Sequence, residues 1–370
     1  MSAPSAGGVA IVGCGVISPA YASTLKQLDF VDLVACADAI PERAAELASA
    51  HGIPKVLTFD EVLADPDIAT IVNLTPPLMH AGVSRAALEA GKATFSEKPL
   101  GVDLDEGRAL VNLSTARGLR LGCAPDTFLG VGFQTCRDVI ERGLIGEPIG
   151  ANAFMLGSGP ESWHPHPDLF YRRGAGPMLD MGPYYLTALV SLLGPARRVT
   201  GSARITHAQR TIGSKPRRGE QIPVEVPTHV ATVIDFESGP IATLVTSFDV
   251  QASRLRNIEI YGTEATLSVP NPNTFDGPVQ IRGARDTAWT DVALRRPYLP
   301  QQRGIGLADM IWATGTGRAH RASSALALHV LELMTASVTA SVENRHIELG
   351  TTCAPAPTLP ADLPVNTFDD

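Results

Sequence analysis

Short apolar runs alternate with helical patterns along the first third of the chain. Continuous runs at 9–12, 70–74 and 92–95 predict strands that are buried on both faces. The segment 41–51 predicts a helix, because it begins with proline and is followed by Gly52. Repeated strand–helix units predict a doubly wound parallel sheet, which binds ligands at the carboxyl ends of its strands.

The pattern changes after residue 150. The run 151–156 predicts the first strand of a new domain, and four later runs follow one another without a helical segment between them. These four runs are 230–236, 241–248, 258–261 and 266–269. Glycine, proline and polar residues join them as hairpin turns do, so they predict an antiparallel sheet.

Length, charge and cysteine content narrow the class of protein. A chain of 370 residues with 44% hydrophobic residues suits two domains with a sizeable core. The net charge of −8 argues against a general nucleic-acid-binding protein. No apolar run approaches about 20 residues and the first residues lack a basic start, so we expect neither a membrane span nor a signal peptide. Five scattered cysteines without a CxxC pair suggest neither disulfides nor zinc, and they fit a cytoplasmic protein.

A glycine-rich turn, GCGVIS at 13–18, follows the first predicted strand and opens a helix. Gly13 allows a tight turn, Gly15 lets the backbone approach a pyrophosphate, and the small Ser18 suits helix–strand packing. The run 31–37 predicts a further strand and leads to Asp38, at about the spacing of ~20 residues expected for an acid that binds a ribose. Glycine turns are common and Asp38 also fits an ordinary turn, so the dinucleotide site is a hypothesis at this point.

The residues after Asp38 bear on the choice of cofactor. Ala39 and Ile40 follow it, and the first arginine is Arg43. An arginine directly beside the acid would suit the 2′-phosphate of NADP. Since none is present there, the sequence favours NAD over NADP.

The segment GPMLDMGPYY at 176–185 opens an apolar run that predicts a helix. If the helix begins at Pro177, Asp180 and Tyr184 share one face and Pro183 kinks it; otherwise the regular helix begins only at Pro183. The ordinary interpretation of this pair is an acid at a helix start and a core tyrosine. The alternative is a site on which the carboxylate and the phenol converge.

A proline-rich loop at 161–171 carries Trp163, His164, Asp168 and Tyr171. Two histidines and an acid allow a metal pair, although no further ligand cluster accompanies them. A packed loop with solvated histidines is the simplest interpretation. In a third interpretation the aromatic rings cover the face of a sugar, and His164 binds its hydroxyls or assists proton transfer.

Several motifs together resemble the Gfo/Idh/MocA family of oxidoreductases. They are VGCGVIS, TPPLMHAGVSRAALEAGK, FSEKPL, RRGAGPMLDMG and the late segment RGIGLADM, so the resemblance covers most of the chain. It implies an α/β fold with an N-terminal Rossmann domain at 1–125. It also implies a C-terminal α+β domain with a large, mainly antiparallel open sheet at 126–350, followed by an irregular tail at 351–370. A tightly held nicotinamide cofactor and a sugar or cyclitol substrate are implied as well.

The resemblance assigns roles to single residues. The family's EKP lysine falls on Lys98, and its DxGxH motif falls on 180–184, where Tyr184 replaces the usual histidine. It implies catalysis by Lys98, Asp180 and Tyr184, with either Lys98 or Tyr184 as the proton-transfer group. The residues expected at the cofactor are Gly13, Gly15, Val16, Ile17, Asp38, Thr75, Pro76, His80, Glu97 and Lys98. Those expected at the substrate are Trp163, His164, Asp168, Tyr171 and Tyr185.

The function that this resemblance implies is hydride transfer between NAD(H) and a secondary alcohol or ketone of a sugar, a sugar derivative or a cyclitol. Two alternatives stay open. One is redox-assisted glycoside cleavage with retained NAD, and the other is a non-catalytic NAD-dependent sugar sensor. The family's use of its sheet predicts a homodimer or homotetramer, and we expect no nucleic-acid partner, no membrane partner and no metal.

Overall fold

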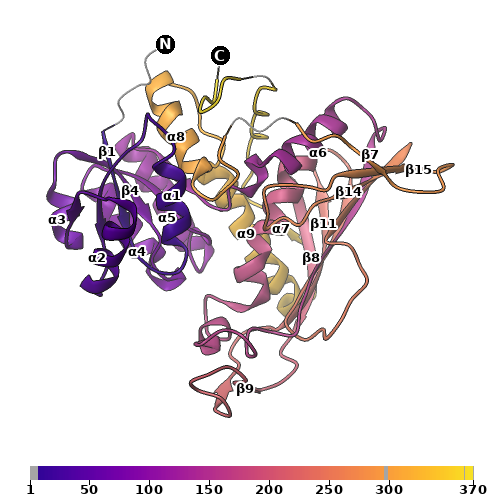
Figure 1. Cartoon of the computed structure of the whole chain (residues 1–370). Coiled ribbons are helices and arrows are strands. Elements are labelled where there is room, and N and C mark those ends of the chain that lie inside the picture. Colours follow the sequence, from indigo (N-terminus) through magenta and orange to yellow (C-terminus); the bar gives the residue numbers. More distant parts are fainter. Residues whose placement is uncertain (1–6, 296–298, 362, 370) are drawn as a thin grey trace. The chain divides into compact units, whose positions relative to one another are not determined.

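The computed structural model describes residues 7–295, 299–361 and 363–369 of the chain (Figure 1). Its contacts divide it into two compact units, which are described one after the other. Unit 1 comprises Met1–Gln134, Arg295–Leu328 and Ala356–Asp370, and unit 2 comprises Thr135–Leu294 and His329–Pro355. The domain bounds at residues 125 and 350 stay a prediction, since they concern which pieces fold and act independently.

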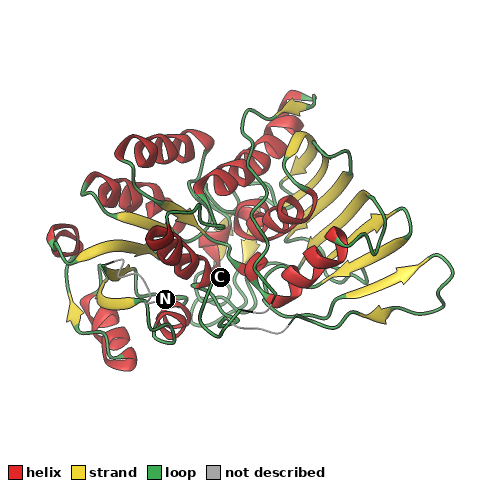
Figure 2. Cartoon of the chain, turned by 90° about the horizontal axis from the view of Figure 1, so that it is seen from above, coloured by secondary structure: helices red, strands yellow, loops and turns green. Residues whose placement is uncertain are grey.

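Unit 1 is built on a six-stranded parallel sheet in the order β3-β2-β1-β4-β5-β6. Helices lie on both faces of this sheet (Figure 2). This confirms the predicted doubly wound Rossmann arrangement. The strands are β1 Gly8–Val12, β2 Asp32–Ala37, β3 Lys55–Val56, β4 Ile68–Asn73, β5 Ala93–Ser96 and β6 Leu121–Cys123, and the helices between them are α1 Ser18–Leu25, α2 Pro41–His51, α3 Phe59–Ala64, α4 Pro77–Glu89 and α5 Leu104–Arg117.

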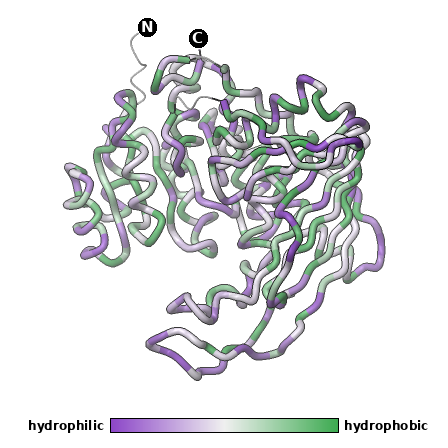
Figure 3. Tube along the Cα trace, turned by 45° about the vertical axis from the view of Figure 1, so that its right-hand side comes forward, coloured by the Kyte–Doolittle hydropathy of each residue, from purple (hydrophilic) through white to green (hydrophobic). Residues whose placement is uncertain are grey.

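The central strands of unit 1 lead directly to the predicted site. Every residue of β1 is buried, and apolar and polar residues alternate in short segments along this part of the chain (Figure 3). The strand order reverses between β1 and β4, and ligands of such sheets bind at the carboxyl ends of the strands at this point. Gly13 N donates to Ala37 O (2.8 Å) and Leu74 N donates to Val12 O (2.8 Å), so the loops there continue the ladder of the sheet.

Helix α5 is absent from the sequence prediction. Asp103 caps it by accepting a hydrogen bond from Glu106 N (3.0 Å), and Gly118 ends it with a φ of 63°. Leu110 is the one buried large apolar side chain in this helix. The apolar stripe is therefore too weak for hydrophobic periodicity to indicate the helix.

Two late segments of the chain complete unit 1. Helix α8 (Ile305–Thr316) packs against α1 and β6. The described residues of the C-terminal tail, 356–361 and 363–369, have an irregular backbone but are anchored by side chains. Phe368 is fully buried, and its ring centroid lies 6.1 Å from that of Phe30 and 6.3 Å from that of Trp312.

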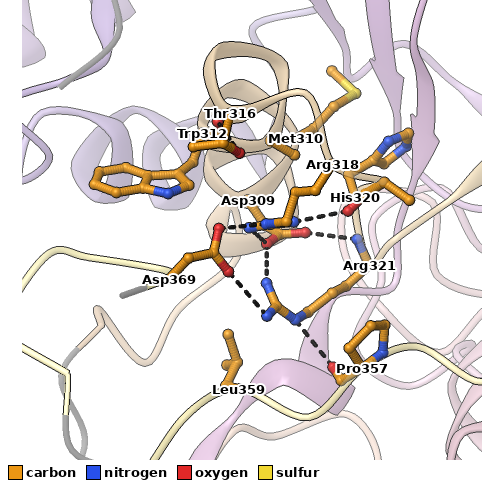
Figure 4. A network of polar contacts seen from close by, with 12 residues as sticks. Asp309, Met310, Trp312, Thr316, Arg318, His320, Arg321, Pro357, Leu359 and Asp369 are labelled. Atoms are coloured by element: carbon orange, nitrogen blue, oxygen red, sulfur yellow. Dashed lines mark hydrogen bonds and ion pairs between the residues drawn. The ribbon is translucent and has the colours of Figure 1, made fainter.

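An ion-pair network fixes this C-terminal segment to α8 (Figure 4). The fully buried Asp309 accepts hydrogen bonds from Arg318 Nη2 (2.6 Å), Arg321 Nη1 (2.5 Å) and Arg321 N (2.6 Å). Asp369 pairs with both arginines, and Arg321 Nε donates to Pro357 O (3.0 Å). The network therefore joins α8, the loop that follows it and the end of the described chain.

Unit 2 is built on a nine-stranded sheet in the order β16-β15-β14-β13-β7-β12-β11-β8-β17. The described pairs in it are antiparallel, except for the parallel pair of β7 and β12. This confirms the predicted large and mainly antiparallel sheet. Helix α7 (Gly176–Leu193) packs on β7, β11 and β12. The strands are β7 Pro148–Leu156, β8 Ala196–Arg204, β11 His229–Phe236, β12 Ile241–Ser247, β13 Ile258–Gly262, β14 Ala265–Val269, β15 Gln280–Gly283, β16 Thr290–Asp291 and β17 Ile347–Glu348, while β9 Gln209–Thr211 and β10 Gln221–Pro223 form a separate pair, and α6 spans Val131–Glu141.

Helix α9 (Ser324–Glu343) differs from the expectation that no segment is long and apolar enough to cross a membrane. Its 20 residues meet that length and composition, but 56% of its most apolar stretch is buried inside the structure. The buried His329 accepts a hydrogen bond from Ala196 N (3.0 Å), and Glu332 accepts one from Thr351 N (2.7 Å). These polar contacts are typical of a packed core helix, and one such helix is weak evidence for a membrane span.

Candidate active site

The glycine turn after β1 has the space that a nucleotide phosphate needs. Gly13 has a φ of 97°, and a Cβ atom there would lie 2.6–2.8 Å from backbone atoms of Leu74 and Thr75, so only glycine fits. At Gly15 a Cβ atom would meet nothing within 4 Å. Ile17, the N-cap of α1, offers no side-chain cap to the helix amides. The turn therefore fits a pyrophosphate held at an uncapped helix start.

Asp38 ties the end of β2 to this turn. Its Oδ2 accepts a hydrogen bond from Cys14 N (2.6 Å), and its Oδ1 accepts one from Ile40 N (2.8 Å). Val16, at the tip of the turn, is fully exposed. The predicted ribose acid and the predicted phosphate turn thus form one hydrogen-bonded unit.

Thr75 and Pro76 follow β4 and lead into α4. The buried side chain of Asn73 organises them, because its Oδ1 accepts hydrogen bonds from Thr75 N (3.2 Å) and Thr75 Oγ1 (2.6 Å). Its Nδ2 donates to His80 O and to Ser84 Oγ, both at 3.0 Å. Sequence reasoning missed Asn73, and the available signal was one polar residue at the end of an apolar strand.

His80 lies behind the loops that follow β4 and β5. Its side chain is 1% exposed, with Nδ1 2.8 Å from Pro99 O and Nε2 2.7 Å from Thr75 O. Burial lowers the pKa of His80, while the hydrogen bond to Pro99 and the charge of Glu97 oppose this shift. His80, which was predicted to lie at the cofactor, therefore supports these two loops from the buried side.

Glu97 and Lys98 follow β5 at the same edge of the sheet. Glu97 N donates to Asn73 O (2.8 Å), Glu97 Oε1 accepts from Tyr21 OH (2.8 Å), and Glu97 Oε2 accepts from Lys98 N (3.0 Å). Both carboxylate oxygens bind protein groups, so Glu97 shapes the turn that presents the half-buried Lys98. Tyr21 was not predicted, because its sequence context is that of an ordinary core tyrosine in α1.

Asp126, in the turn after β6, caps helix α8 from a distant part of the sequence. Its Oδ2 accepts hydrogen bonds from Gly304 N (2.8 Å) and Gly306 N (3.0 Å). Its Oδ1 finds no hydrogen-bond partner among the residues that the structure describes. Burial raises the pKa of Asp126 to about 6 and Glu97 adds to this, while the two N–H groups and Arg303 oppose it.

Replacing Asp126 by asparagine should change how stability depends on pH. The raised pKa of about 6, against 3.8 for the ordinary group, means that the folded state binds the proton more tightly than the unfolded chain. The free energy of unfolding should therefore gain up to roughly 3 kcal/mol from this group as the pH falls from about 8 to about 4. Denaturant unfolding across this range should show that gain for the wild type and for Asp32→Asn, an exposed control on β2. A gain of the same size in Asp126→Asn would contradict the assignment.

In unit 2, Asp180 and Tyr184 of the segment 176–185 lie on helix α7. This helix runs without a break from Gly176 to Leu193 with Pro183 inside it, which agrees with the earlier of the two expected helix starts. Asp180 and Tyr184 are four residues apart and share one face. Tyr184 is buried and Asp180 is half-buried.

The neighbours of this pair fix the helix in place. A Cβ atom at Gly182 would lie 2.9 Å from the sulfur of Met178, so a larger residue there would require the Met178 side chain to move. Tyr185 is buried, and its hydroxyl accepts a hydrogen bond from Asn257 Nδ2 (2.9 Å). Burial raises the pKa of Tyr185. This predicted substrate residue is thus held as a neutral phenol in the core of unit 2.

Trp163 and His164 form an aromatic group with Phe170 in the predicted substrate loop. The ring centroid of His164 lies 4.9 Å from that of Phe170 and 5.4 Å from that of Trp163. Ser214 Oγ donates to His164 O (2.5 Å), which ties the loop to the segment between β9 and β10. Trp163 is 65% exposed, so a large apolar face is available to a ligand.

Asp168, the acid of this loop, is engaged by two arginines. Arg217 Nη1 lies 2.7 Å from its Oδ1, and Arg172 Nη2 lies 2.9 Å from its Oδ2. Burial raises the pKa of Asp168, but the hydrogen bond and charge of Arg217 outweigh this and hold the pKa below its usual value. The basic loop 215–218 therefore supplies an ion-pair partner to Asp168. Within the described ranges, no three His, Cys, Asp or Glu side chains come together as a metal site requires.

Tyr171 belongs to a charged cluster that the sequence did not reveal. Its fully buried ring lies 5.4 Å from the guanidinium of Arg210. Arg210 pairs with Glu161 (3.1 Å) and with Asp249, so residues of three distant segments meet there. Burial raises the pKa of Tyr171, and the charge of Glu161 adds to this. The cluster holds the base of the predicted substrate loop.

Two family models match the chain. The oxidoreductase family with an NAD-binding Rossmann fold matches residues 8–124, and the GFO/IDH/MocA C-terminal domain matches residues 133–268. Together the two matches cover more than half of the 370 residues.

Individual proteins of known name are similar over most of their length. Inositol 2-dehydrogenase of Rhizobium meliloti (strain 1021) is 26% identical over 92% of this chain and 98% of its own. The 1,5-anhydro-D-fructose reductase of Ensifer adhaerens is 28% identical over 74% of this chain and 79% of its own. A structure of levoglucosan dehydrogenase in complex with NADH and levoglucosan aligns with a TM-score of 0.79 at 22% identity, over 93% of this chain and 99% of that chain.

The fold, the two family matches and the motifs agree. The parallel sheet with its glycine turn corresponds to the matched Rossmann domain, and six of the nine strands of the mainly antiparallel sheet, β7, β8 and β11–β14, lie almost entirely in the part matched by the second model. The chain therefore belongs to the Gfo/Idh/MocA oxidoreductase family, with an NAD-binding Rossmann domain in unit 1.

Proposed function

We propose that the protein is a dehydrogenase or reductase that transfers a hydride between NAD(H) and a secondary alcohol or ketone of a sugar, a sugar derivative or a cyclitol. The observation that carries this proposal is the similarity to inositol 2-dehydrogenase along nearly the whole chain. Inositol, anhydrofructose and levoglucosan, named with the three relatives above, are all polyhydroxylated rings. A ring of this class is the substrate that we propose here.

The cofactor would be held at the carboxyl edge of the unit 1 sheet. Bound NAD accepts a hydride at the nicotinamide ring, and NADH returns it. The backbone of the turn at 13–17 would hold the pyrophosphate, and Asp38 would bind the ribose. Thr75, Pro76, Glu97 and Lys98 would border the rest of the cofactor. A negatively charged Asp38 beside the uncharged Ile40 disfavours a 2′-phosphate, which supports NAD over NADP.

Three residues would act on the substrate hydroxyls. Tyr184 is our first choice for the group that takes or gives the hydroxyl proton, Lys98 would polarise the oxygen, and Asp180 would bind a neighbouring hydroxyl. A tyrosine has an ordinary pKa of about 10, and a nearby ammonium group lowers it toward neutrality. The alternative assignment exchanges the roles of Lys98 and Tyr184.

The loop at 161–171 would bind the rest of the sugar. The exposed ring of Trp163 suits stacking on a sugar face, and His164 beside it can bind a hydroxyl. Asp168 would contribute to the loop through its ion pairs with Arg172 and Arg217. The buried Tyr171 and Tyr185 would support the site from the core. We also propose a homodimer or homotetramer formed through the unit 2 sheet, working in the cytoplasm.

A panel of sugars, cyclitols and their keto forms tests the proposed function. The purified protein is mixed with each compound and NAD+ or NADH, and the absorbance of NADH near 340 nm is followed. We expect turnover with at least one polyhydroxylated ring, and faster turnover with NAD than with NADP. Glycoside cleavage without net NADH would favour internal redox catalysis instead. Sugar binding without any redox change would contradict the enzyme and favour a sensor.

A further inference from the structure

Both ring nitrogens of His80 face oxygen atoms that can only accept hydrogen bonds. Nδ1 lies 2.8 Å from Pro99 O and Nε2 lies 2.7 Å from Thr75 O. A neutral imidazole carries one N–H, so one of its nitrogens would present a lone pair to a carbonyl lone pair. Two donors are available only in the imidazolium form. The geometry of this pocket therefore matches a doubly protonated ring.

The two carbonyl groups belong to the two loops that border the cofactor site. Thr75 follows β4, and Pro99 follows Lys98 after β5. The ring is 1% exposed, so bulk water does not replace a lost carbonyl partner. His80 is thus a single side chain that holds both loops at once.

The charges that act on His80 oppose one another. Burial is the largest effect and lowers the pKa of His80 below its ordinary value, and the ammonium of Lys98 adds to this, whereas the carbonyl contacts and the carboxylate of Glu97 oppose the shift. Glu97 is itself bound by Tyr21 OH and Lys98 N. The proton on His80 is therefore held by the two loop carbonyls and by Glu97, and it is lost most readily when either loop moves away.

We propose that His80 is a positioning residue that locks the two cofactor loops by donating both ring N–H groups, so that NAD binding is linked to protonation of His80. The inference rests on the proposed contacts of Thr75, Pro76, Glu97 and Lys98 with NAD. Because NAD would touch both loops, it favours the state in which both carbonyls bind the ring. By linkage, NAD binding takes up a proton and tightens as the pH falls through the range in which His80 titrates.

Three variants separate the two hydrogen bonds. In His80→Asn the amide nitrogen can replace Nδ1 and keep the Pro99 contact, and in His80→Gln it can replace Nε2 and keep the Thr75 contact. His80→Phe keeps the ring and neither donor. None of the three can be protonated. His51→Gln, at the end of α2, is the matched control for replacement of a histidine in unit 1.

Calorimetric titration with NAD in buffers of different ionisation enthalpy measures the proton uptake. We expect uptake by the wild type and by His51→Gln, and none by the three His80 variants. The Kd for NAD should rise by roughly ten- to a hundredfold in His80→Asn and His80→Gln. This difference should shrink as the pH rises through the range in which the wild-type ring loses its proton. Uptake that survives in both His80→Asn and His80→Gln would overturn the proposal.

The ring itself is observed in wild-type protein labelled with ¹⁵N-histidine, with the His80 signal assigned by its loss in His80→Asn. In the NAD complex, at the lowest pH at which the protein stays folded, both nitrogens of His80 should carry protons. A complex in which one nitrogen is unprotonated would refute the proposal even if the variants fail to fold. Wild-type protein that binds no NAD would contradict the proposed function. The same ¹⁵N measurement on the protein without NAD would then test this inference. It would be refuted if one ring nitrogen of His80 stays unprotonated at every pH at which the protein is folded.

Discussion

Lys98→Met should lower kcat by about a thousandfold for any ring compound that the protein oxidises. Methionine keeps the length and the apolar stem but removes the ammonium group that would polarise the hydroxyl oxygen and lower the pKa of the phenol. The turn after β5 should stay intact, because Lys98 N binds Glu97 through the backbone. Steady-state rates of NADH formation measure the effect, and the Kd for NADH shows whether cofactor binding survives.

Lys26→Met provides the matched control for this change. Lys26 is exposed at the end of α1 and donates to Gly52 O (3.0 Å), so its loss should leave kcat unchanged. A kcat within tenfold of the wild type in Lys98→Met would rule out the proposed role. Tyr184→Phe then separates the two assignments of the proton-transfer group. If one of the two variants no longer shows the pKa that governs the wild-type pH–rate profile, the residue replaced in that variant is the proton-transfer group.

The fold could be predicted where its signals are local in the sequence. The buried strand β1 is a short apolar run, and α2 is bracketed by Pro41 and Gly52, whose φ of 61° ends the helix. Helix α8 gave no such signal about its partner. It joins unit 1 because Asp126 binds Gly304 N and Gly306 N, which lie far along the chain, and no period in hydrophobicity reports such contacts.

The candidate site shows the same limit at the level of side chains. Gly13 and Asp38 were located because their chemistry is tied to a fixed spacing along one strand–helix–strand unit. Asn73 orients the loop after β4. The sequence does not indicate this role, because it depends on how the loop after the strand folds. His80 was expected at the cofactor from a resemblance alone, and its two buried carbonyl partners became visible only in the structure.

Asp309→Ala should destabilise the folded protein by about 3–5 kcal/mol, the largest effect on stability that we expect. Asp309 is fully buried and binds both Arg318 and Arg321. Arg321 is 4% exposed, so its guanidinium would remain buried and, among the described residues, would keep only Asp369 and Pro357 O as partners. The free energy of unfolding, measured with denaturant at neutral pH, should show the loss.

Glu343→Ala is the contrasting control, because its partner Arg345 is 61% exposed. Removing that surface pair should cost less than about 1 kcal/mol. If the loss comes from an uncompensated buried charge, Arg321→Met in the Asp309→Ala background should recover part of the lost stability. Equal losses in Asp309→Ala and Glu343→Ala would show that the network does not hold the C-terminal segment. A double variant that is less stable than either single variant would assign the effect to lost packing instead of unpaired charge.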